Sequence, residues 1–412
     1  MSNQQDTKKK NPNVPNLRFS GFTEEWQTES ANSLFEVIPN NTISRDGLNY
    51  ESGTWKNIHY GDILTLFPTL LDVNDVSVPY ISSASFSSKT ALSSGDVVIA
   101  DTAEDYTAGK ALEVIGAENT KTVPGLHTIA CHPTRTFSSG FLGYYLNSFA
   151  YRERIKPFIQ GIKVYSISKG NFLRSSLSFP SIQEQAKIGS FLSLLDKRIE
   201  VQNKIIRDLE SQIVAINNRF FDSLQSVALF RDLYECAGEG GTPDTKERDY
   251  YEPAEIPFIK IENLYEKYLR SHSEHISKIG LRNSSAWLVP AQCVLLSNGA
   301  TIGECTITTY PVCTKQGIIG IVPSSQTSAE FLYLLFKSRC FKRKLRCITT
   351  KGTMDAAYLK DINQMIFPFC DQKEQQRHIG AMKPFEEKLE MEKRLLFCLK
   401  KEKEYLLRNL FI

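Results

Sequence analysis

The chain carries one apolar motif twice: FLGYYL stands at residues 141–146 and FLYLLF at residues 331–336. The two motifs are 190 residues apart, and other segments repeat at nearly the same offset. The matched pairs are Gly125 with Gly317, Gly161 with Gly352, Phe179-Pro180 with Phe367-Pro368, and Gln185–Ile188 with Gln376–Ile379. Such a repeat is far longer than the roughly 20–50 residues of a solenoid or propeller unit. The sequence therefore predicts that a whole domain, together with the helix that follows it, is duplicated.

Each copy leads into a long heptad pattern. Apolar residues alternate steps of three and four from Ile188 to Phe220, and again in the C-terminal segment, where Glu392 and Lys403 interrupt the seam. The predicted seam residues are Ile188, Leu192, Leu195, Ile199, Ile206, Leu209, Ile213, Ile216 and Phe220 in the first helix, and Leu389, Leu396, Leu399, Leu406 and Leu410 in the second. Because each stripe is narrow, each helix needs one partner helix, and we expect the two to pack antiparallel within the chain.

These patterns predict an α+β fold with two similar globular domains, separated by two long antiparallel coiled-coil helices and related by a pseudo-two-fold axis. Strands are expected at 96–99, 112–115, 256–261, 293–296, 306–308 and 318–322, and single helices near 139–155 and 328–346. The predicted boundaries are a flexible tail at 1–16, a first domain at 17–182, a central helix at 183–224, a second domain at 225–371 and a C-terminal helix at 372–412.

Composition narrows the class of protein. With 412 residues, 41% of them hydrophobic and 23% charged, the chain is typical of a globular protein with two or three domains. Its nine cysteines form no CxxC pair and no apolar signal segment opens the chain, so we expect a reduced, cytoplasmic protein without a membrane span. The sequence shows no P-loop, dinucleotide-binding, HExxH or amino-methyltransferase signature. It therefore predicts a non-catalytic chain that binds no cofactor or metal.

Basic residues cluster in the second half although the net charge is only +3. Six of the ten residues at 337–346 are Lys or Arg, which could neutralise several DNA phosphates; a solvated helix face is the alternative explanation. Other Arg, Lys and Asn residues are candidates for base contacts. The predicted DNA-binding residues are Arg45, Lys56, Lys89, Arg152, Arg154 and Lys163 in the first half, and Lys246, Arg248, Arg270, Asn298, Lys337, Arg339, Lys342, Arg343, Lys344, Arg346 and Lys351 in the second.

The arrangement closely resembles the specificity subunit of type I restriction-modification systems over nearly the whole chain. The resemblance is carried by FPSIQEQAKI at 179–188, FLSLLDKRI at 191–199, SNGATIG at 297–303 and QGI at 316–318. It implies that each domain is a target recognition domain that reads one part of a bipartite, asymmetric site in double-stranded DNA, while the helices set the spacer. It also implies docking of two modification subunits, which would supply S-adenosylmethionine, and of restriction subunits, which would use ATP and Mg.

Two other interpretations remain open at this point. The chain could be a non-DNA scaffold whose coiled coil dimerises and whose two domains bind proteins. It could also be a fused enzyme with its own methyltransferase, which the missing signature disfavours. Binding to duplex DNA with a steep salt dependence would separate the DNA-binding interpretation from the scaffold.

Overall fold

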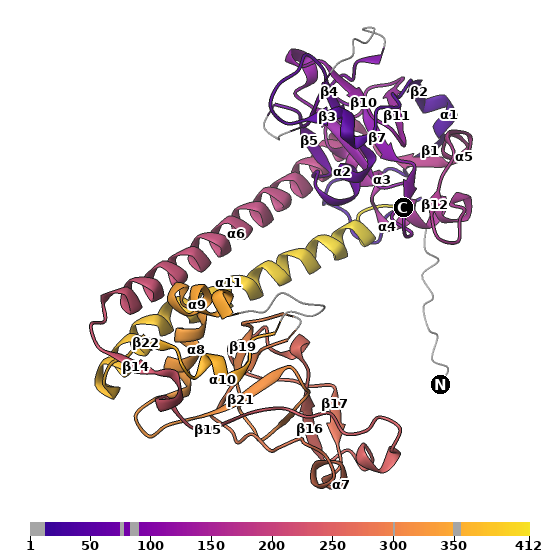
Figure 1. Cartoon of the computed structure of the whole chain (residues 1–412). Helices are drawn as coiled ribbons and strands as arrows, with labels where there is room; N and C mark the ends of the chain where they lie inside the picture. Colours follow the sequence, from indigo (N-terminus) through magenta and orange to yellow (C-terminus); the bar gives the residue numbers. More distant parts are fainter. Residues whose placement is uncertain (1–12, 75–77, 83–89, 300, 349–355) are drawn as a thin grey trace, which may run out of the picture. The chain divides into compact units, whose positions relative to one another are not determined.

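The computed structural model describes residues 13–74, 78–82, 90–299, 301–348 and 356–412 (Figure 1). The chain divides into two compact units, Met1–Asn203 with Arg394–Ile412 and Lys204–Lys393. Each unit combines small β-sheets and short helices with one part of each long helix, α6 (Ile182–Ser223) and α11 (Gln372–Asn409). The fold is therefore α+β, as predicted.

The first unit contains a five-stranded sheet in the order β2-β11-β7-β9-β5 and a four-stranded sheet in the order β10-β4-β6-β3. Its strands are β1 (Gln27–Ser30), β2 (Phe35–Ile38), β3 (Leu48–Asn49), β4 (Lys56–Ile58), β5 (Leu70–Asp72), β6 (Tyr80–Ile81), β7 (Val97–Ala100), β8 (Thr102–Ala103), β9 (Ala111–Ile115), β10 (Thr122–Pro124), β11 (Thr128–Pro133), β12 (Tyr165–Ser166) and β13 (Ser176–Phe179). Its short helices are α1 (Ala31–Leu34), α2 (Tyr60–Thr65), α3 (Phe141–Leu146), α4 (Phe149–Ile155) and α5 (Lys169–Arg174). All four residues of β7 are buried, as its unbroken apolar run predicts for a central strand.

The second unit contains a four-stranded sheet in the order β15-β21-β18-β19, a three-stranded sheet in the order β17-β16-β20, and the pair β14-β22. Its strands are β14 (Val227–Leu229), β15 (Tyr234–Glu239), β16 (Ile256–Ile259), β17 (Glu274–Ile276), β18 (Val294–Ser297), β19 (Cys305–Ile307), β20 (Cys313–Thr314), β21 (Ile318–Pro323) and β22 (Ile366–Pro368). Its short helices are α7 (Lys278–Arg282), α8 (Ala329–Lys337), α9 (Arg339–Ile348) and α10 (Leu359–Ile362).

The two units repeat one strand order. The run β15-β21-β18-β19 matches β2-β11-β7-β9, β17-β16-β20 matches β6-β4-β10, and β14-β22 matches β1-β13. The one parallel pair of the smaller sheet, β10 with β4, is also parallel in the second unit, as β16 with β20. The predicted duplication and the six predicted strands are therefore confirmed.

The single helices predicted near 139–155 and 328–346 are wrong, because each segment forms two helices. The break falls at Ser148 between α3 and α4, and at Ser338 between α8 and α9. Each serine is buried and caps the second helix, accepting a hydrogen bond from the backbone N–H of Tyr151 or Phe341 at 3.3 Å. Serine competes with helical backbone pairing and favours such caps, which explains the interruption.

In each unit a segment of α6 packs against a segment of α11 that runs in the opposite direction. In the first unit, Lys403 Nζ lies 2.5 Å from Asp196 Oδ1, and the seam residues Ile188, Leu192, Leu195, Leu399, Leu406 and Leu410 belong to one buried core. In the second, Lys393 Nζ lies 2.7 Å from Glu210 Oε1. The remaining seam residues, Ile199, Ile206, Leu209, Ile213, Ile216, Phe220, Leu389 and Leu396, are buried or half-buried.

A glutamine side chain joins the start of each long helix to its own unit. Gln185 Oε1 accepts a hydrogen bond from Ser138 N at 3.1 Å, and Gln375 Oε1 accepts the same bond from Ser328 N at 3.1 Å. Each amide also donates to the backbone just before its helix, Gln185 to Pro180 O at 2.9 Å and Gln375 to Cys370 O at 3.0 Å. The equivalent of Gln185 is therefore Gln375, and the predicted match to Gln376 is wrong by one residue.

Candidate nucleic-acid interface

Helix α9 concentrates the basic residues of the second unit on one side. Phe341 and Leu345 are buried in the core, four residues apart. Residues at this spacing share one face of a helix, so the cations between them project from the other faces. Ser338 fixes where the helix begins. The sequence therefore forms an amphipathic helix with an apolar inner face and a basic outer face.

Three cations of the predicted cluster 337–346 are held by contacts within the unit. Lys337 Nζ lies 3.0 Å from Glu304 Oε2, and Arg339 Nη2 lies 2.7 Å from Asp222 Oδ2. Lys344 Nζ donates to the carbonyl of Ile366 and lies over the Phe367 ring. These three side chains anchor α8, α9 and β22 to neighbouring elements.

The other three cations, Lys342, Arg343 and Arg346, are exposed and form no ion pair with any described residue. We call them the basic face of α9. With Lys337 and Arg339 of the same cluster, and with Val214 and Asn218 of α6, they line a cavity of about 430 Å³. Flexible cations around an open groove suit a polyanion better than a small ligand.

The first unit has no matching basic face among its described residues, because its corresponding arginines are used internally. Arg154 Nη1 donates to Ser178 Oγ at 2.9 Å and to Ser176 O at 3.4 Å, as Lys344 does to Ile366 O at the equivalent strand. Arg152 Nη2 donates to Ala108 O at 2.8 Å, and burial lowers the pKa of its guanidinium. The two halves therefore differ in exposed charge at this helix.

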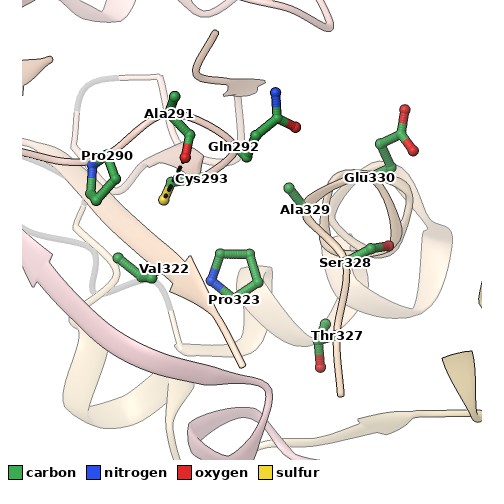
Figure 2. A pocket seen from close by; sticks show the side chains of 10 residues that line it. All are labelled: Pro290, Ala291, Gln292, Cys293, Val322, Pro323, Thr327, Ser328, Ala329 and Glu330. Carbon is green, nitrogen blue, oxygen red and sulfur yellow. Dashed lines mark hydrogen bonds between the residues drawn. The ribbon is translucent and has the colours of Figure 1, made fainter. Parts of the chain in front are cut away.

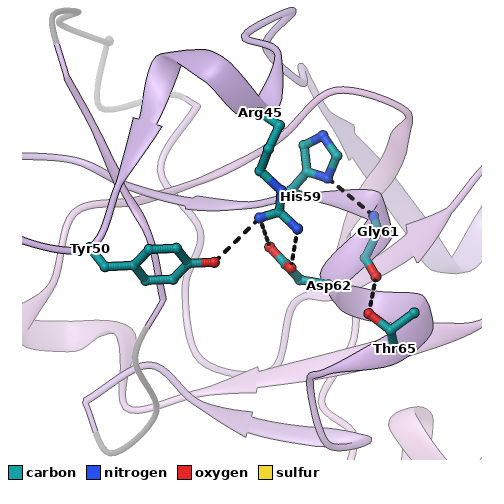
Figure 3. A network of polar contacts seen from close by, with 6 residues as sticks. All are labelled: Arg45, Tyr50, His59, Gly61, Asp62 and Thr65. Atoms are coloured by element: carbon teal, nitrogen blue, oxygen red, sulfur yellow. Dashed lines mark hydrogen bonds and ion pairs between the residues drawn. The ribbon is translucent and has the colours of Figure 1, made fainter. Parts of the chain in front are cut away.

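The four remaining predicted residues of the first half have different surroundings. Arg45 forms a two-bond ion pair with the buried Asp62, at 2.8 Å and 2.6 Å (Figure 3). Lys56 Nζ donates to Val73 O at 2.6 Å, so this amine forms a hydrogen bond within the first unit. Lys163 is exposed, and Lys89 lies outside the described residues.

In the second half, Lys246 and Arg248 are exposed on the segment before β16, and Arg248 Nε lies 2.8 Å from Glu252 Oε2. Arg270 Nη1 lies 3.3 Å from Glu390 Oε1. Asn298 is buried, and its Oδ1 accepts no hydrogen bond from a described residue. Lys351 lies outside the described residues.

Sequence comparison of the halves missed His127. Backbone hydrogen bonds from Asp101 N to His127 O and from Asn298 N to Gly317 O, both 3.0 Å long, occupy the same place in the two units. His127 has φ 55° and Gly317 has φ 92°. The equivalent of Gly317 is therefore His127, and the predicted match to Gly125 is wrong. The match to Gly125 rested on spacing along the chain, whereas the turn at Gly317 has a positive φ, which glycine adopts freely.

The family model of the type I restriction modification DNA specificity domain matches residues 23–211 and 230–401. The chain belongs to this family. Its repeat is thus a pair of specificity domains, and the resemblance noted in the sequence is confirmed.

Two curated relatives of this specificity-domain chain are similar over part of it. The MjaIX type I restriction enzyme specificity subunit of Methanocaldococcus jannaschii is 29% identical over 189 residues, which are 45% of this chain and 43% of that protein. The HindI type I restriction enzyme specificity subunit of Haemophilus influenzae is 30% identical over 115 residues, 28% of this chain and 25% of that protein. The matches thus span less than half the length of these relatives.

Two solved structures share the fold of the specificity-domain chain. The S subunit of a type I restriction-modification system from M. genitalium superposes with a TM-score of 0.55 at 13% identity, over 97% of this chain and 99% of that one. A chain from a structure describing complex assembly and conformational transition of the type I R-M system gives a TM-score of 0.58 at 15% identity, over 94% and 98%. At these identities the likeness shows the fold alone.

One further hollow of this specificity-domain chain, of about 390 Å³, lies between the segment before β18 and the start of α8 (Figure 2). Burial raises the pKa of the Cys293 thiol to about 11, so it stays protonated near neutral pH and is a poor nucleophile. The Glu330 carboxylate is engaged by the Tyr268 hydroxyl. Cys293 and Glu330 are therefore explained by contacts within the unit.

Neither a metal site nor a membrane-spanning helix is found in the described part of the specificity-domain chain. Among the described residues, no cluster of three or more His, Cys, Asp or Glu side chains is arranged to hold a metal ion. Within the same part of the chain, none of the helices has both the length and the apolar character that crossing a membrane requires.

Proposed function

We propose that the chain is the DNA specificity subunit of a type I restriction-modification complex and that each unit reads one half of a bipartite, asymmetric site. The observation that carries this proposal is the double match to the specificity-domain family, on two units that repeat one strand order. Two domains of one design with different surfaces suit a site with two different halves.

The basic face of α9 is proposed to contact DNA phosphates. Lys342, Arg343 and Arg346 are exposed next to one another and lack a carboxylate partner among the described residues. Cations of this kind release counterions when they bind DNA, which gives affinity and salt dependence without sequence preference. Base contacts must then come from other side chains.

The long helices are proposed to fix the spacer between the two half-sites. Helix α6 has 42 residues, which at about 1.5 Å per residue gives a length of about 63 Å. Seven added residues would lengthen each helix by about 10 Å, which corresponds to about three base pairs. A heptad inserted into both helices should therefore change the preferred spacer and leave both half-sites intact.

The outer faces of the long helices are proposed to dock two modification subunits. In the first unit, Leu194, Val201, Phe397 and Tyr405 are 57–65% exposed on α6 and α11. Large apolar side chains gathered on an exposed helix face mark a protein interface, and partner helices with their own apolar stripe would cover it. Restriction subunits would join the same complex.

The chemistry is proposed to lie in the partner subunits. This chain would bind no cofactor, and S-adenosylmethionine, ATP and Mg would be bound by the modification and restriction subunits. The cytoplasm, where those cofactors and the genomic DNA are found, is the proposed location. The chain itself would be non-catalytic and would supply sequence recognition and spacing.

The test is adenine methylation mapping of cells that express this chain with its modification subunits. We expect methylation at one bipartite motif that disappears when this chain is omitted. Replacing residues 225–371 with the same domain of another family member should change one half-site and keep the other. Methylation without this chain, or no methylated motif at all with both kinds of subunit present, would contradict the proposal.

A further inference from the structure

The two units differ in side chains at one place where their backbones agree. Asp101 and Asn298 hold equivalent positions, because Ile167 N donates to Asp101 O at 2.8 Å and Ala357 N donates to Asn298 O at 3.0 Å. Their own N–H groups donate to His127 O and Gly317 O. The first unit thus pairs Asp101 with His127 where the second pairs Asn298 with Gly317.

His127 holds a backbone conformation that its side chain disfavours. A φ of 55° is rare for residues other than glycine, and such strain gathers at functional sites. Gly317 shows that the turn needs no side chain in the second unit. The turn therefore does not require the His127 imidazole.

Neighbouring groups hold the His127 ring in place while half of it faces solvent. The side chain is 48% exposed, its Nδ1 lies 3.4 Å from Asp101 Oδ1, and its ring contacts the Tyr60 ring edge-on at 5.3 Å. Nε2 forms no hydrogen bond with a described residue. The exposed edge of the ring thus offers a polar atom in a fixed position.

Arg45 lies in the same cluster and is also held in place. The Tyr60 ring contacts both His127 and His59, and the pKa of His59 is lowered first by burial and then by the charge of nearby Arg45. Asp62 binds both terminal nitrogens of Arg45, and Tyr50 Oη lies 3.4 Å from Nη1 (Figure 3). Of the five N–H groups of this guanidinium, Nε–H and one Nη2–H are left without a described partner.

The cluster has no excess of positive charge, because Asp62 faces Arg45 and Asp101 faces His127. Such a cluster adds little to phosphate attraction, in contrast to the basic face of α9. Fixed donors and acceptors are what base edges require, and an arginine fork is the commonest reader of guanine. In a duplicated protein that reads two different half-sites, base-reading residues should differ at equivalent positions, as they do here.

We propose that Arg45, Tyr60 and His127 form a base-reading cluster for the half-site of the first unit. This inference rests on the proposed function as a DNA specificity subunit. It assigns sequence preference to a cluster without excess positive charge and leaves phosphate contact to α9.

The test uses the full chain in complex with its modification subunits and compares methylation of duplexes in which each position of both half-sites is varied. His127→Gly is the main variant, because glycine relaxes the backbone there and a role in folding alone predicts unchanged or higher thermal stability with unchanged preference. The second variant, Arg45→Gln with Asp62→Asn, removes the guanidinium without leaving a buried charge unpaired. Arg135→Ala is the matched control, since Arg135 is 46% exposed and ion-paired to Glu29, much as Arg45 is to Asp62.

We expect each of the two test variants to lose about tenfold or more discrimination at one or two positions of one half-site, with the other half-site unchanged. The Arg135→Ala variant should keep the wild-type discrimination at both half-sites. Variants that methylate as efficiently as the wild type with all preferences intact would overturn the inference and leave the proposed function standing. A wild-type complex that reads no bipartite site would overturn both.

Discussion

His378 Nε2 lies 3.1 Å from Asn217 Oδ1, which links α11 to α6 inside the second unit. Asn217 Nδ2 also donates to Leu334 O at 2.8 Å, so its oxygen is the acceptor and His378 is the donor. The His378 ring stacks on Phe220 with a centroid distance of 3.7 Å. A single buried asparagine and histidine thus tie both long helices to α8.

Acid should destabilise the second unit through His378. Burial lowers the pKa of this imidazole from 6.5 to about 4, so the folded protein keeps it neutral while the unfolded chain takes up a proton below about pH 6.5. The contribution of the neutral His378 imidazole to the free energy of unfolding is complete above pH 6.5 and is lost as the pH falls toward 4. Hydrogen exchange of α8 and of residues 204–223, corrected for the intrinsic effect of pH, should therefore accelerate as the pH falls from 7 to 5.

The matched variant is His378→Gln, which retains a donor but does not titrate in this range. Its exchange rates, corrected for the intrinsic effect of pH, should depend less on pH than those of the wild type. Equal dependence in the two proteins would show that another group controls acid stability. Asn217→Ala should destabilise the unit by about 1–3 kcal/mol, because Leu334 O and His378 both lose their partner.

The first unit should respond to pH in the opposite direction through Glu113. This carboxyl on β9 accepts hydrogen bonds from Gly140 N at 2.6 Å and Gly143 N at 2.9 Å, at the start of α3. Burial nevertheless raises its pKa from 4.5 to about 7. The folded state therefore binds a proton more strongly than the unfolded chain, and stability should fall as the pH rises from about 4.5 to about 7.

Hydrogen exchange of β7 and β9, corrected for the intrinsic effect of pH, measures this effect separately from the second unit. The variant Glu113→Gln should abolish the pH dependence between pH 5 and pH 7. The variant should also destabilise the unit at pH 5. The NH2 group of the glutamine cannot accept a hydrogen bond, so one of the two backbone N–H donors, Gly140 or Gly143, would lose its acceptor. A wild-type unit that becomes more stable over this range would contradict the assignment.

Much of the fold follows from spacing along the chain. Apolar steps of three and four identify both long helices, and short β-branched runs such as Val97–Ala100 identify the buried strands. The breaks at Ser148 and Ser338 were missed because the apolar pattern continues in step through Tyr151 and Phe341. A cap depends on one hydrogen bond, which hydrophobic periodicity does not register.

The site was harder to predict because the relevant partners are far apart in sequence. In the sequence, the six cations at 337–346 are indistinguishable from one another in charge. Glu304 and Asp222 neutralise Lys337 and Arg339 from 33 and 117 residues away. His127 carries no sequence signal, since only the backbone hydrogen bonds show that it occupies the position of Gly317.

Removing the basic face of α9 should weaken DNA binding in a salt-dependent way. The triple change Lys342→Gln, Arg343→Gln and Arg346→Gln should lower the slope of log affinity against log salt by up to about 3, because each phosphate contact contributes about 0.9. Half-site preference in methylation should remain, since phosphate contacts carry no base information. Titration of a labelled duplex at several salt concentrations measures the slope.

The control for this change is Lys278→Gln with Arg282→Gln, which removes two exposed cations from α7 in the same unit. If binding depends only on net charge, the control should lower the slope by up to about 2. If the basic face contacts DNA, the slope of the control should stay close to that of the wild type. An unchanged slope in the triple variant would remove α9 from the DNA interface.

Substitutions at two leucines on α6 should distinguish the role of this helix in the stability of the chain from its role in assembly with partner subunits. Leu192 is fully buried in the core that α6 shares with α11 in the first unit, whereas Leu194 is 65% exposed on the same helix. Leu192→Ala should destabilise the chain by about 2–5 kcal/mol, as large-to-small changes in a packed core do. Leu194→Ala should change stability by no more than about 0.5 kcal/mol. Denaturant unfolding of the two variants measures this difference.

If the outer helix faces dock modification subunits, Leu194→Ala should instead weaken that association. Replacing Leu194 with Asp should weaken it further, because a charge would be buried in an apolar interface. Calorimetry or co-purification with the modification subunit measures the effect, and Leu66→Ala provides the control, since Leu66 is 59% exposed at the end of α2. Equal binding by the Leu194 and Leu66 variants would exclude this part of α6 as a docking surface and would leave the seam prediction from Leu192 unaffected.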